Sequence, residues 1–345
     1  MKKIVLLSSI IILMIVGVYS INTNAAISNK APIKVGVLLY KEEDYFISLV
    51  RDALLKIEND NKDIVDFIFY DGKANQELQN KQVDEAINNK VDLILVNLVD
   101  INQSDTVINK AKENNLPIIL FSGEPLSLNG IKSYGKSLYI GTEGCESGNL
   151  QGEMIVKEWN NKNIIDRNGD NKIQYVLLQG EKNDLEAQYR SECVIRTINQ
   201  KGIQSSELAS EFCNWDKECA RIRVESLFLG YGDTIELIIS NNDEMAIGAI
   251  MALQEKGYNM GDPNKYIPVV GIDGIDEAKK LIENGLMTGT VIQDAEGMAE
   301  ALYRIGMNLA QNKKPLSDTD YKFDSTGVAV RIPYKGYIIR NSPNL

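Results

Sequence analysis

The sequence of 345 residues contains no histidine. This absence excludes the Ser-His-Asp and Cys-His schemes of nucleophilic catalysis and argues against a catalytic zinc site, which usually needs imidazole ligands. The GxxxxGK[ST] phosphate-binding loop is also missing. Basic residues are outnumbered, because 37 Lys and Arg stand against 48 Asp and Glu, which gives a net charge of −11. Since nucleic-acid binding needs a basic surface, we expect no nucleic-acid partner.

Cysteine is scarce, with four residues in the whole chain. Four cysteines allow three full pairings, and the sequence does not choose among them. Cys213 and Cys219 are six positions apart and could close a small loop. Cys145 and Cys193 fit a disulfide and a pair of buried thiols equally well.

The N-terminal segment has the three-part pattern of a secretory signal. Lys2 and Lys3 precede an apolar run from Ile4 to Ile21, and small residues lead up to Ala26. We therefore predict that residues 1–25 are a cleaved signal peptide and that the protein acts outside the cytoplasm, in the periplasm or at the cell surface. The alternative is an uncleaved membrane anchor, although a run of 18 residues that contains serines is short for a membrane span.

From Ile33 onward, short apolar runs alternate with amphipathic stretches. This rhythm predicts an α/β fold of parallel sheets covered by helices on both faces. The rhythm starts again after residues 138–144, where the sequence reads LYIGTEG. We therefore predict two doubly wound lobes that are joined by several chain crossings.

The predicted strands end in segments rich in Asp, Glu, Asn and Ser. In open parallel sheets, ligands bind outside the carboxyl ends of the strands. Each of these residues taken singly is more typical of a helix cap than of a ligand site. Their number favours a cleft for a polyhydroxylated ligand, and Phe46 and Trp215 could stack on its apolar faces or pack in the core. The segments are YKEED, YDGKA, NLVD, FSGEP, QGEKND, SNNDE, GIDGID and IQDAEG.

A second motif, DRNGDNKIQ at residues 166–174, follows the spacing of a calcium-binding loop. Position twelve, which should hold a bidentate Glu, is Leu177 in a predicted buried strand. The alternative is a surface turn rich in Asp and Asn. The candidate ligands at positions one, three, five, seven (by its carbonyl) and nine are Asp166, Asn168, Asp170, Lys172 and Gln174.

Several segments, taken in order, resemble the periplasmic galactose/glucose-binding protein family, the solute receptors of sugar ABC transporters and of chemotaxis. They are VGVLLYKEEDYF, VNLVD, IQYVLLQGE, IISNNDEMAIGA and VVGIDGIDEA. The resemblance spans roughly residues 33–340 and implies the type I periplasmic binding protein fold. It implies a first lobe of residues 33–140 plus 293–326 and a second lobe of 141–292 plus 327–341. It also implies a monomer that is no enzyme, which binds a hexopyranose, galactose or glucose first, between lobes that close by hinge bending and delivers it to ABC permease subunits.

The resemblance assigns residues to both sites. For a structural calcium ion, it implies that Glu236 supplies the carboxylate missing from position twelve. At the sugar site four positions depart from the family in residue type: Ser122, Asp184, Glu186 and Gln293. Asp184 stands where the family has a histidine and offers only acceptors at neutral pH, so the hexose is not fixed. The remaining implied sugar-binding residues match the family in type: Asp44, Phe46, Arg190, Trp215, Asn242 and Asp273.

Three alternatives to transport follow from the same residues. The protein could report the sugar to a chemoreceptor or a membrane sensor kinase, which the sequence does not separate from delivery. Paired carboxylates could serve a glycosidase, but the resemblance accounts for them as hydrogen-bond partners of a bound sugar. A sugar-responsive repressor of this architecture would begin with a helix-turn-helix, whereas this chain begins with a signal-like segment.

Overall fold

The computed structural model describes residues 31–160 and 165–338. The fold described below belongs to the unit that begins at Ile33. The predicted signal peptide, residues 1–25, lies outside the described residues. No helix in the described ranges has the length and apolar content that crossing a membrane requires.

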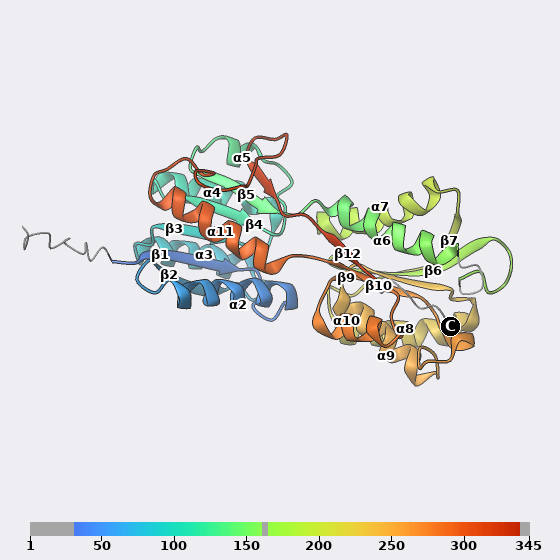
Figure 1. The fold of residues 1–345 in the computed structure, drawn as a ribbon. Helices are drawn as coiled ribbons and strands as arrows, with labels where there is room; N and C mark the ends of the chain where they lie inside the picture. Colours follow the sequence, from blue (N-terminus) through green and yellow to red (C-terminus); the bar gives the residue numbers. More distant parts are fainter. Residues whose placement is uncertain (1–30, 161–164, 339–345) are drawn as a thin grey trace, which may run out of the picture. The chain divides into compact units, whose positions relative to one another are not determined.

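The first sheet is parallel throughout and is covered by helices on both faces (Figure 1). Its strands are β1 (Ile33–Leu39), β2 (Val65–Asp71), β3 (Leu93–Val96), β4 (Ile118–Phe121), β5 (Ser137–Gly141) and β11 (Ala329–Arg331). Its helices are α2 (Tyr45–Asp60), α3 (Gln76–Asn88), η1 (Ile101–Gln103), α4 (Ser104–Glu113), α5 (Asn129–Lys132) and α11 (Ala295–Ala310). The strand order is β11-β5-β4-β3-β1-β2. Alternation along β1 divides the core, because Val37 and Leu39 pack with α2 and α11 while Leu38 packs with α3 and α4.

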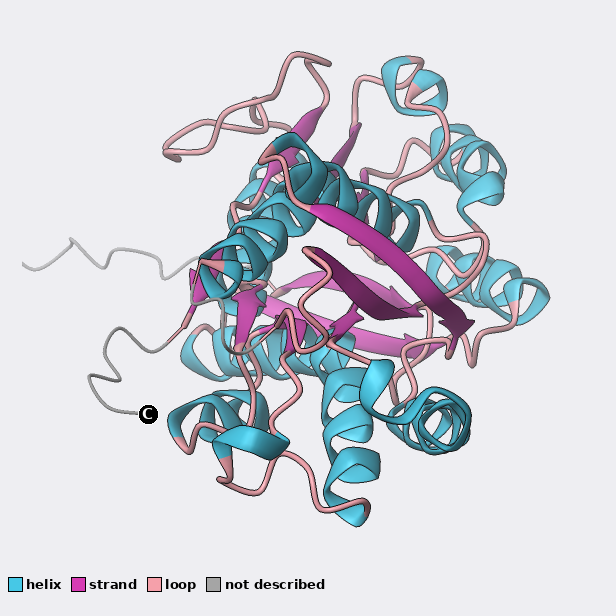
Figure 2. Cartoon of the chain, turned by 90° about the vertical axis from the view of Figure 1, so that its right-hand side faces the viewer, coloured by secondary structure: helices cyan, strands magenta, loops and turns pink. Residues whose placement is uncertain are grey.

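The second sheet is built in the same way, except that its last strand is antiparallel to its neighbour. Its strands are β6 (Lys172–Gln179), β7 (Gln204–Phe212), β8 (Leu237–Ser240), β9 (Val269–Asp273), β10 (Gly289–Ile292) and β12 (Lys335–Tyr337). Its helices are α6 (Gly144–Trp159), α7 (Leu185–Gln200), α8 (Lys217–Tyr231), η2 (Gly232–Thr234), α9 (Asp243–Glu255), η3 (Pro263–Lys265) and α10 (Asp276–Glu283). The strand order is β12-β10-β9-β8-β6-β7, and Figure 2 shows the magenta strands among the cyan helices. The predicted α/β class with two doubly wound sheets is therefore confirmed.

The chain passes between the two sheets at three places in the described residues: after β5, after β10, and between β11 and β12. The last passage corrects one predicted boundary. The prediction that residues 327–341 lie wholly in the second lobe is wrong for β11, which pairs with β5 in the first sheet. Ala329 and Val330 are buried there, so burial of these apolar side chains explains the placement. Residues 339–341 lie outside the described part of the chain.

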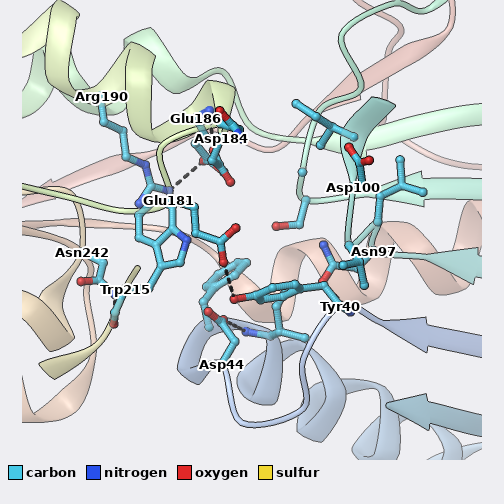
Figure 3. A pocket seen from close by; sticks show the side chains of 18 of the residues that line it. Tyr40, Asp44, Asn97, Asp100, Glu181, Asp184, Glu186, Arg190, Trp215 and Asn242 are labelled. Carbon is cyan, nitrogen blue, oxygen red and sulfur yellow. Dashed lines mark hydrogen bonds and ion pairs between the residues drawn. The ribbon is translucent and has the colours of Figure 1, made fainter. Parts of the chain in front are cut away.

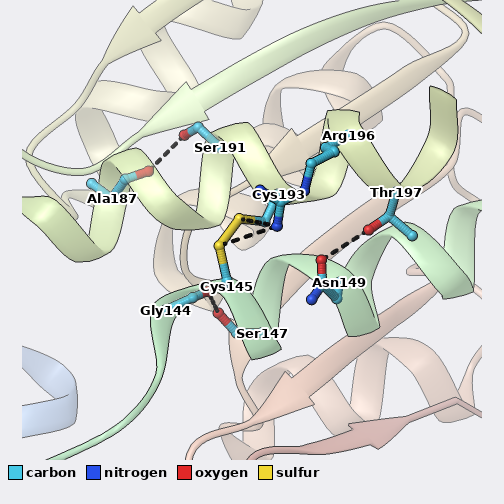
Figure 4. Close-up of a disulfide and its surroundings, with 9 residues drawn as sticks. All are labelled: Gly144, Cys145, Ser147, Asn149, Ala187, Ser191, Cys193, Arg196 and Thr197. Carbon is cyan, nitrogen blue, oxygen red and sulfur yellow. Dashed lines mark hydrogen bonds between the residues drawn. A yellow bond between two sulfur atoms is a disulfide. The ribbon is translucent and has the colours of Figure 1, made fainter. Parts of the chain in front are cut away.

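A disulfide joins Cys145 on α6 to Cys193 on α7, with the Cα atoms 5.3 Å apart (Figure 4). Cys213 and Cys219, the pair that spacing alone suggested, are free thiols. Cys213 is buried in the core beside α8. Cys145 and Cys193, in contrast, face each other from two helices that pack together. The pairing therefore depends on helix packing and not on separation in sequence.

Candidate functional site

A cavity of about 320 Å³ lies at the carboxyl ends of strands from both sheets. Such a volume is at the lower end of the range of roughly 300–1,000 Å³ that is typical of small-ligand sites. Loops after parallel strands reach it, which is the expected place for a ligand in this fold class. Their role in binding a sugar stays a prediction, but the structure brings together at this cavity all the residues predicted for it: Asp44, Phe46, Ser122, Asp184, Glu186, Arg190, Trp215, Asn242, Asp273 and Gln293.

Three of these residues also cap helices, so the helix-cap interpretation is confirmed for them, and a ligand-binding role stays a prediction. Asp44 Oδ1 accepts from the N–H of Ile47 at 2.9 Å and caps α2. Asp184 Oδ1 accepts from the N–H of Glu186 at 2.7 Å and caps α7, and Asn242 caps α9 in the same way. Because each carboxylate uses one oxygen for its cap, the other oxygen can face a ligand.

Arg190 organises the part of the cavity next to α7 (Figure 3). The residue is only 3% exposed. Its Nη1 donates to the carbonyl of Asn241 at 2.6 Å, and its Nη2 donates to Glu186 Oε1 at 2.7 Å and to Gln293 Oε1 at 2.8 Å. Its Nε is buried and has no hydrogen-bond partner in the described structure. An unpaired buried donor is costly, so this nitrogen is suited to an acceptor on a ligand.

Glu186 connects Arg190 to two of the chain passages between the sheets. Its Oε1 accepts from Thr142 Oγ1 at 2.9 Å and from the hydroxyl of Tyr334. Thr142 follows β5, and Tyr334 lies between β11 and β12. Burial opposes ionisation of Glu186, but Arg190 and the hydrogen bonds from Tyr334 and Thr142 outweigh it and lower the pKa of this carboxyl. Glu186 is therefore held as a carboxylate against segments that link the two sheets.

Asp273, the last residue of β9, is also buried in the cavity wall. Its Oδ1 lies 4.0 Å from Arg190 Nη1, and its backbone φ of 128° is unusual for a residue other than glycine. Desolvation raises the pKa of Asp273 well above its usual range, and Arg190 opposes the rise. A hydrogen-bond donor on a ligand would satisfy this carboxylate.

The two aromatic residues predicted for a clamp both line the cavity but differ in their surroundings. Phe46 is 8% exposed and belongs to the core beneath α2 and α11. The Trp215 ring lies 5.6 Å from the guanidinium carbon of Arg190 and rests on Gly180, where a Cβ atom would meet Trp215 Cζ2 at 2.1 Å. Only glycine fits beneath the indole, which fixes one wall of the cavity.

Sequence reasoning did not single out about half of the residues that line the cavity. Most of them lie in strand-end segments that the sequence marked as polar, such as NLVD after β3 and QGEKND after β6. Selecting every polar residue in those segments would have found the polar lining residues that they contain. The apolar ones carry no such signal, because an apolar residue after a strand is equally typical of core. The additional residues are Tyr40, Ile47, Asn97, Leu98, Val99, Asp100, Ile101, Asn102, Gly123, Glu181 and Asn183.

The DRNGDNKIQ loop lies next to Glu236, as the resemblance implied. Glu236 Oε1 accepts from the N–H of Arg167 at 2.8 Å, and Oε2 accepts from the N–H of Gln174 at 3.1 Å. Asn171, at the turn of the loop, has a φ of 60°, a left-handed geometry that Asn tolerates better than most residues. The loop is thus folded around the Glu236 carboxylate.

The donor chemistry of this loop suits a calcium ion. Asp166 Oδ1 and Gln174 Oε1 are buried and accept no hydrogen bond in the described structure. Calcium is bound by oxygen atoms of this kind, including amide and backbone carbonyl oxygens. Within the described ranges no three Asp, Glu, Cys or His side chains gather as a metal-binding group, so any site here depends on Asn168, the Lys172 carbonyl and Gln174 as well.

Comparisons with known proteins agree with this architecture. Residues 35–314 match the family described as the periplasmic binding protein domain. The chain is 36% identical over 339 residues to the D-galactose/methyl-galactoside binding periplasmic protein MglB of Haemophilus influenzae, which covers 97% of each chain.

Solved structures share the fold at lower sequence identity. An ABC transporter solute binding protein from Bacillus halodurans with bound myo-inositol matches with a TM-score of 0.73 and 24% identity, over 89% of this chain and 95% of that one. A periplasmic solute binding protein from Actinobacillus succinogenes with bound D-allose matches with a TM-score of 0.73 and 19% identity, over 89% and 97%. The chain belongs to the periplasmic binding protein family, the substrate-binding proteins of ABC transporters, and is a binding protein and not an enzyme.

Proposed function

We propose that this protein is an extracytoplasmic receptor that binds a hexopyranose, galactose or glucose first, and delivers it to an ABC sugar transporter. One observation carries the proposal: the predicted sugar-binding residues line one cavity, and the buried Nε of Arg190, one of them, has no hydrogen-bond partner in the described part of the chain. A sugar hydroxyl would accept from Nε, and the Trp215 ring would cover an apolar sugar face. The relation to MglB, whose name records galactose binding, points to the same ligand class.

Calorimetric titration of the protein, as exported by the cell that expresses it, tests this proposal. We expect galactose or glucose to bind and ribose to bind more weakly, because the pentose lacks one hydroxymethyl group. Trp215→Ala should weaken hexose binding by at least about tenfold, since an aromatic face would be removed from the sugar. The matched control is Trp159→Ala, which changes a tryptophan outside the cavity and should leave the affinity unchanged.

If no hexose gives a binding signal in the calorimeter, the proposed function is contradicted. If the Trp215→Ala variant binds hexose as tightly as the parent protein, the indole does not contribute to the site, and the proposed function still stands. The variant should keep the circular dichroism spectrum of the parent, because the Trp215 ring is only partly buried.

A different cyclic polyol is the second candidate. Structural neighbours of this chain were solved with myo-inositol and with D-allose, and residues of this cavity differ from the galactose/glucose family pattern at Ser122, Asp184, Glu186 and Gln293. Glu186 and Gln293, two of these four, share one Arg190 nitrogen and so set the shape of the cavity near α7. Adding myo-inositol and D-allose to the titration distinguishes the candidate ligands. A permease gene beside this one would favour delivery to a transporter, and a sensor-kinase gene would favour sensing.

We propose further that the DRNGDNKIQ loop holds a structural calcium ion. Asp166, Asn168, Asp170, the Lys172 carbonyl, Gln174 and Glu236 would supply the oxygens. The ion would satisfy the orphaned oxygens of Asp166 and Gln174. Burial and the charge of Asp166 raise the pKa of Glu236, while its backbone hydrogen bonds lower it. A cation bound at this carboxylate would offset the effects of burial and of the Asp166 charge.

Removing calcium should therefore lower the melting temperature. A ligand that binds only the folded state stabilises it by about 2.7 kcal/mol at a hundredfold excess over its Kd. We expect a chelator to lower the melting temperature, calcium to restore it, and Asp170→Asn to weaken the response. Asp262→Asn is the control, because Asp262 caps η3 outside the loop. An identical melting curve in metal-stripped and calcium-loaded protein would contradict the proposal.

A further inference from the structure

Acidic side chains dominate the cavity described above. Six of the residues that line it are Asp or Glu, and Arg190 is the one lining cation in the described part of the chain. Arg190 approaches two of them, with Nη2 at 2.7 Å from Glu186 and Nη1 at 4.0 Å from Asp273. Lys41 lies near Asp44 but does not line the cavity. The other lining carboxylates form no salt bridge among the described residues: Asp44, Asp100, Glu181 and Asp184.

Glu181 accepts from a tyrosine hydroxyl, and the charges of two other lining carboxylates act on the same tyrosine. Tyr40 donates to Glu181 Oε1 at 3.0 Å (Figure 3). Burial, together with the charges of Glu181, Asp44 and Asp184, raises the pKa of Tyr40. Glu181, Asp184 and Asp44 therefore act on one region of the cavity. Among the described residues they do not form a metal-binding group.

The surroundings of Asp184 oppose its ionisation. Burial and the neighbouring Glu186 carboxylate raise the pKa of Asp184 to about 6. Its Oδ1 is fixed by the helix cap, and no hydrogen bond to its Oδ2 occurs in the described structure. A cation placed against Oδ2 would be attracted by Asp184 and by Glu181, since opposite charges favour the ionised form.

A second, independent feature requires an acceptor elsewhere on the ligand. Arg190 lines the same cavity, and its Nε is buried and has no hydrogen-bond partner among the described residues. It lies beside the Trp215 ring, which can cover an apolar ring face. The cavity therefore offers an aromatic wall and a charged donor near α7, and a group of carboxylates around Tyr40.

We propose that the ligand is an amino sugar, whose ammonium group is bound by Asp184 and Glu181 and whose hydroxyl oxygen accepts from Arg190 Nε. This inference rests on the proposed function, because it names the class of sugar that the same cavity takes. A neutral hexose satisfies Arg190 but brings no positive charge to a cavity that six carboxyl groups and a single arginine line among the described residues. An ammonium group supplies that charge together with donors for Asp184 Oδ2.

Titration with matched sugars tests the inference. Galactosamine and glucosamine should each bind at least about tenfold more tightly than galactose and glucose, a difference that corresponds to about 1.4 kcal/mol. The N-acetyl derivatives keep the nitrogen but lose its charge, so they should bind no better than the neutral hexoses. All titrations use the exported, calcium-loaded protein at neutral pH and at two salt concentrations.

One variant isolates the charge without disturbing the helix. Asp184→Asn keeps the cap of α7, because Asn and Asp cap helices about equally well. It should reduce the preference for the amino sugar over its parent hexose to near unity. The matched control is Asp216→Asn, which makes the same change at the cap of α8, outside the cavity, and should leave the preference intact.

The outcomes separate the inference from the proposed function. Tight binding of neutral hexoses with equal or weaker binding of amino sugars overturns the inference and leaves the proposed function standing. Failure of both classes to bind overturns both. If the Asp184→Asn variant still prefers the amino sugar over its parent hexose, Asp184 does not bind the ammonium group, and the proposed site is overturned.

Discussion

Replacing Arg190 with methionine is expected to abolish measurable sugar binding and to lower the free energy of unfolding by about 3–5 kcal/mol, which is typical when one partner of a buried ion pair is removed. The arginine is 3% exposed. Methionine keeps much of the side-chain length but donates no hydrogen bond. Glu186 would lose its ion pair, and Gln293 and the Asn241 carbonyl would lose a donor.

Urea denaturation followed by circular dichroism measures the loss of stability, and calorimetry measures binding. Arg190→Lys separates charge from geometry, since an ammonium group restores the charge but not the planar fork that bonds several partners at once. We expect this variant to recover part of the stability and little of the binding. Arg223→Met is the matched control, because Arg223 is exposed on α8 and such changes shift stability by less than about 0.5 kcal/mol.

Binding that survives in Arg190→Met would contradict the central role of this guanidinium. A variant that loses binding but keeps full stability would contradict the predicted loss of stability. Because Arg190 lowers the pKa of Glu186, replacing Arg190 should raise that pKa. Once Glu186 is protonated, the loss of stability that remains comes from the missing hydrogen bonds.

Removing the disulfide should produce the second large effect. Cys145 and Cys193 are separated by 48 residues in sequence, and the loop-closure relation gives about 4 kcal/mol for a cross-link over such a loop. The bond ties α6 to α7 (Figure 4). Helix α7 is capped by Asp184 and carries Glu186 and Arg190. We expect a Cys145→Ala, Cys193→Ala double variant to lose about 2–5 kcal/mol of stability.

The effect on binding should be smaller than the effect on stability. Gly148 of α6 lies so close to α7 that a Cβ atom there would meet the Arg190 carbonyl oxygen at 2.7 Å. This close packing keeps α7 in place without the bond, so the sugar affinity should fall by no more than about tenfold.

Thermal melts with and without a reductant measure the contribution of the bond. The reductant should lower the melting temperature of the parent protein and leave that of the double variant unchanged. Cys219→Ala is the control, since Cys219 is a free, partly exposed thiol. A parent protein that melts at the same temperature under both conditions would contradict the stabilising role of the disulfide.

Local pattern predicted much of the binding cavity. Asp44, Asp184 and Asn242 follow strands and precede helices, so the sequence placed them at the carboxyl edges of two sheets. Parallel sheets bring such edges to one side, and the structure gathers these residues around one cavity for that reason. The roles of Thr142 and Tyr334 were not predicted, because a hydrogen bond to Glu186 across 44 or 148 positions leaves no local signal.

The sequence by itself determined the α/β class, the two sheets and the strand ends that carry polar groups. These features follow from hydrophobic periodicity and from backbone preferences of single residues, which are local properties. Only the tertiary structure decided the Cys145–Cys193 pairing, the placement of β11 in the first sheet, and the sharing of Arg190 among Glu186, Gln293 and Tyr334. These depend on which buried surfaces meet, and the free energy of such contacts comes from packing and desolvation between segments that are distant in sequence.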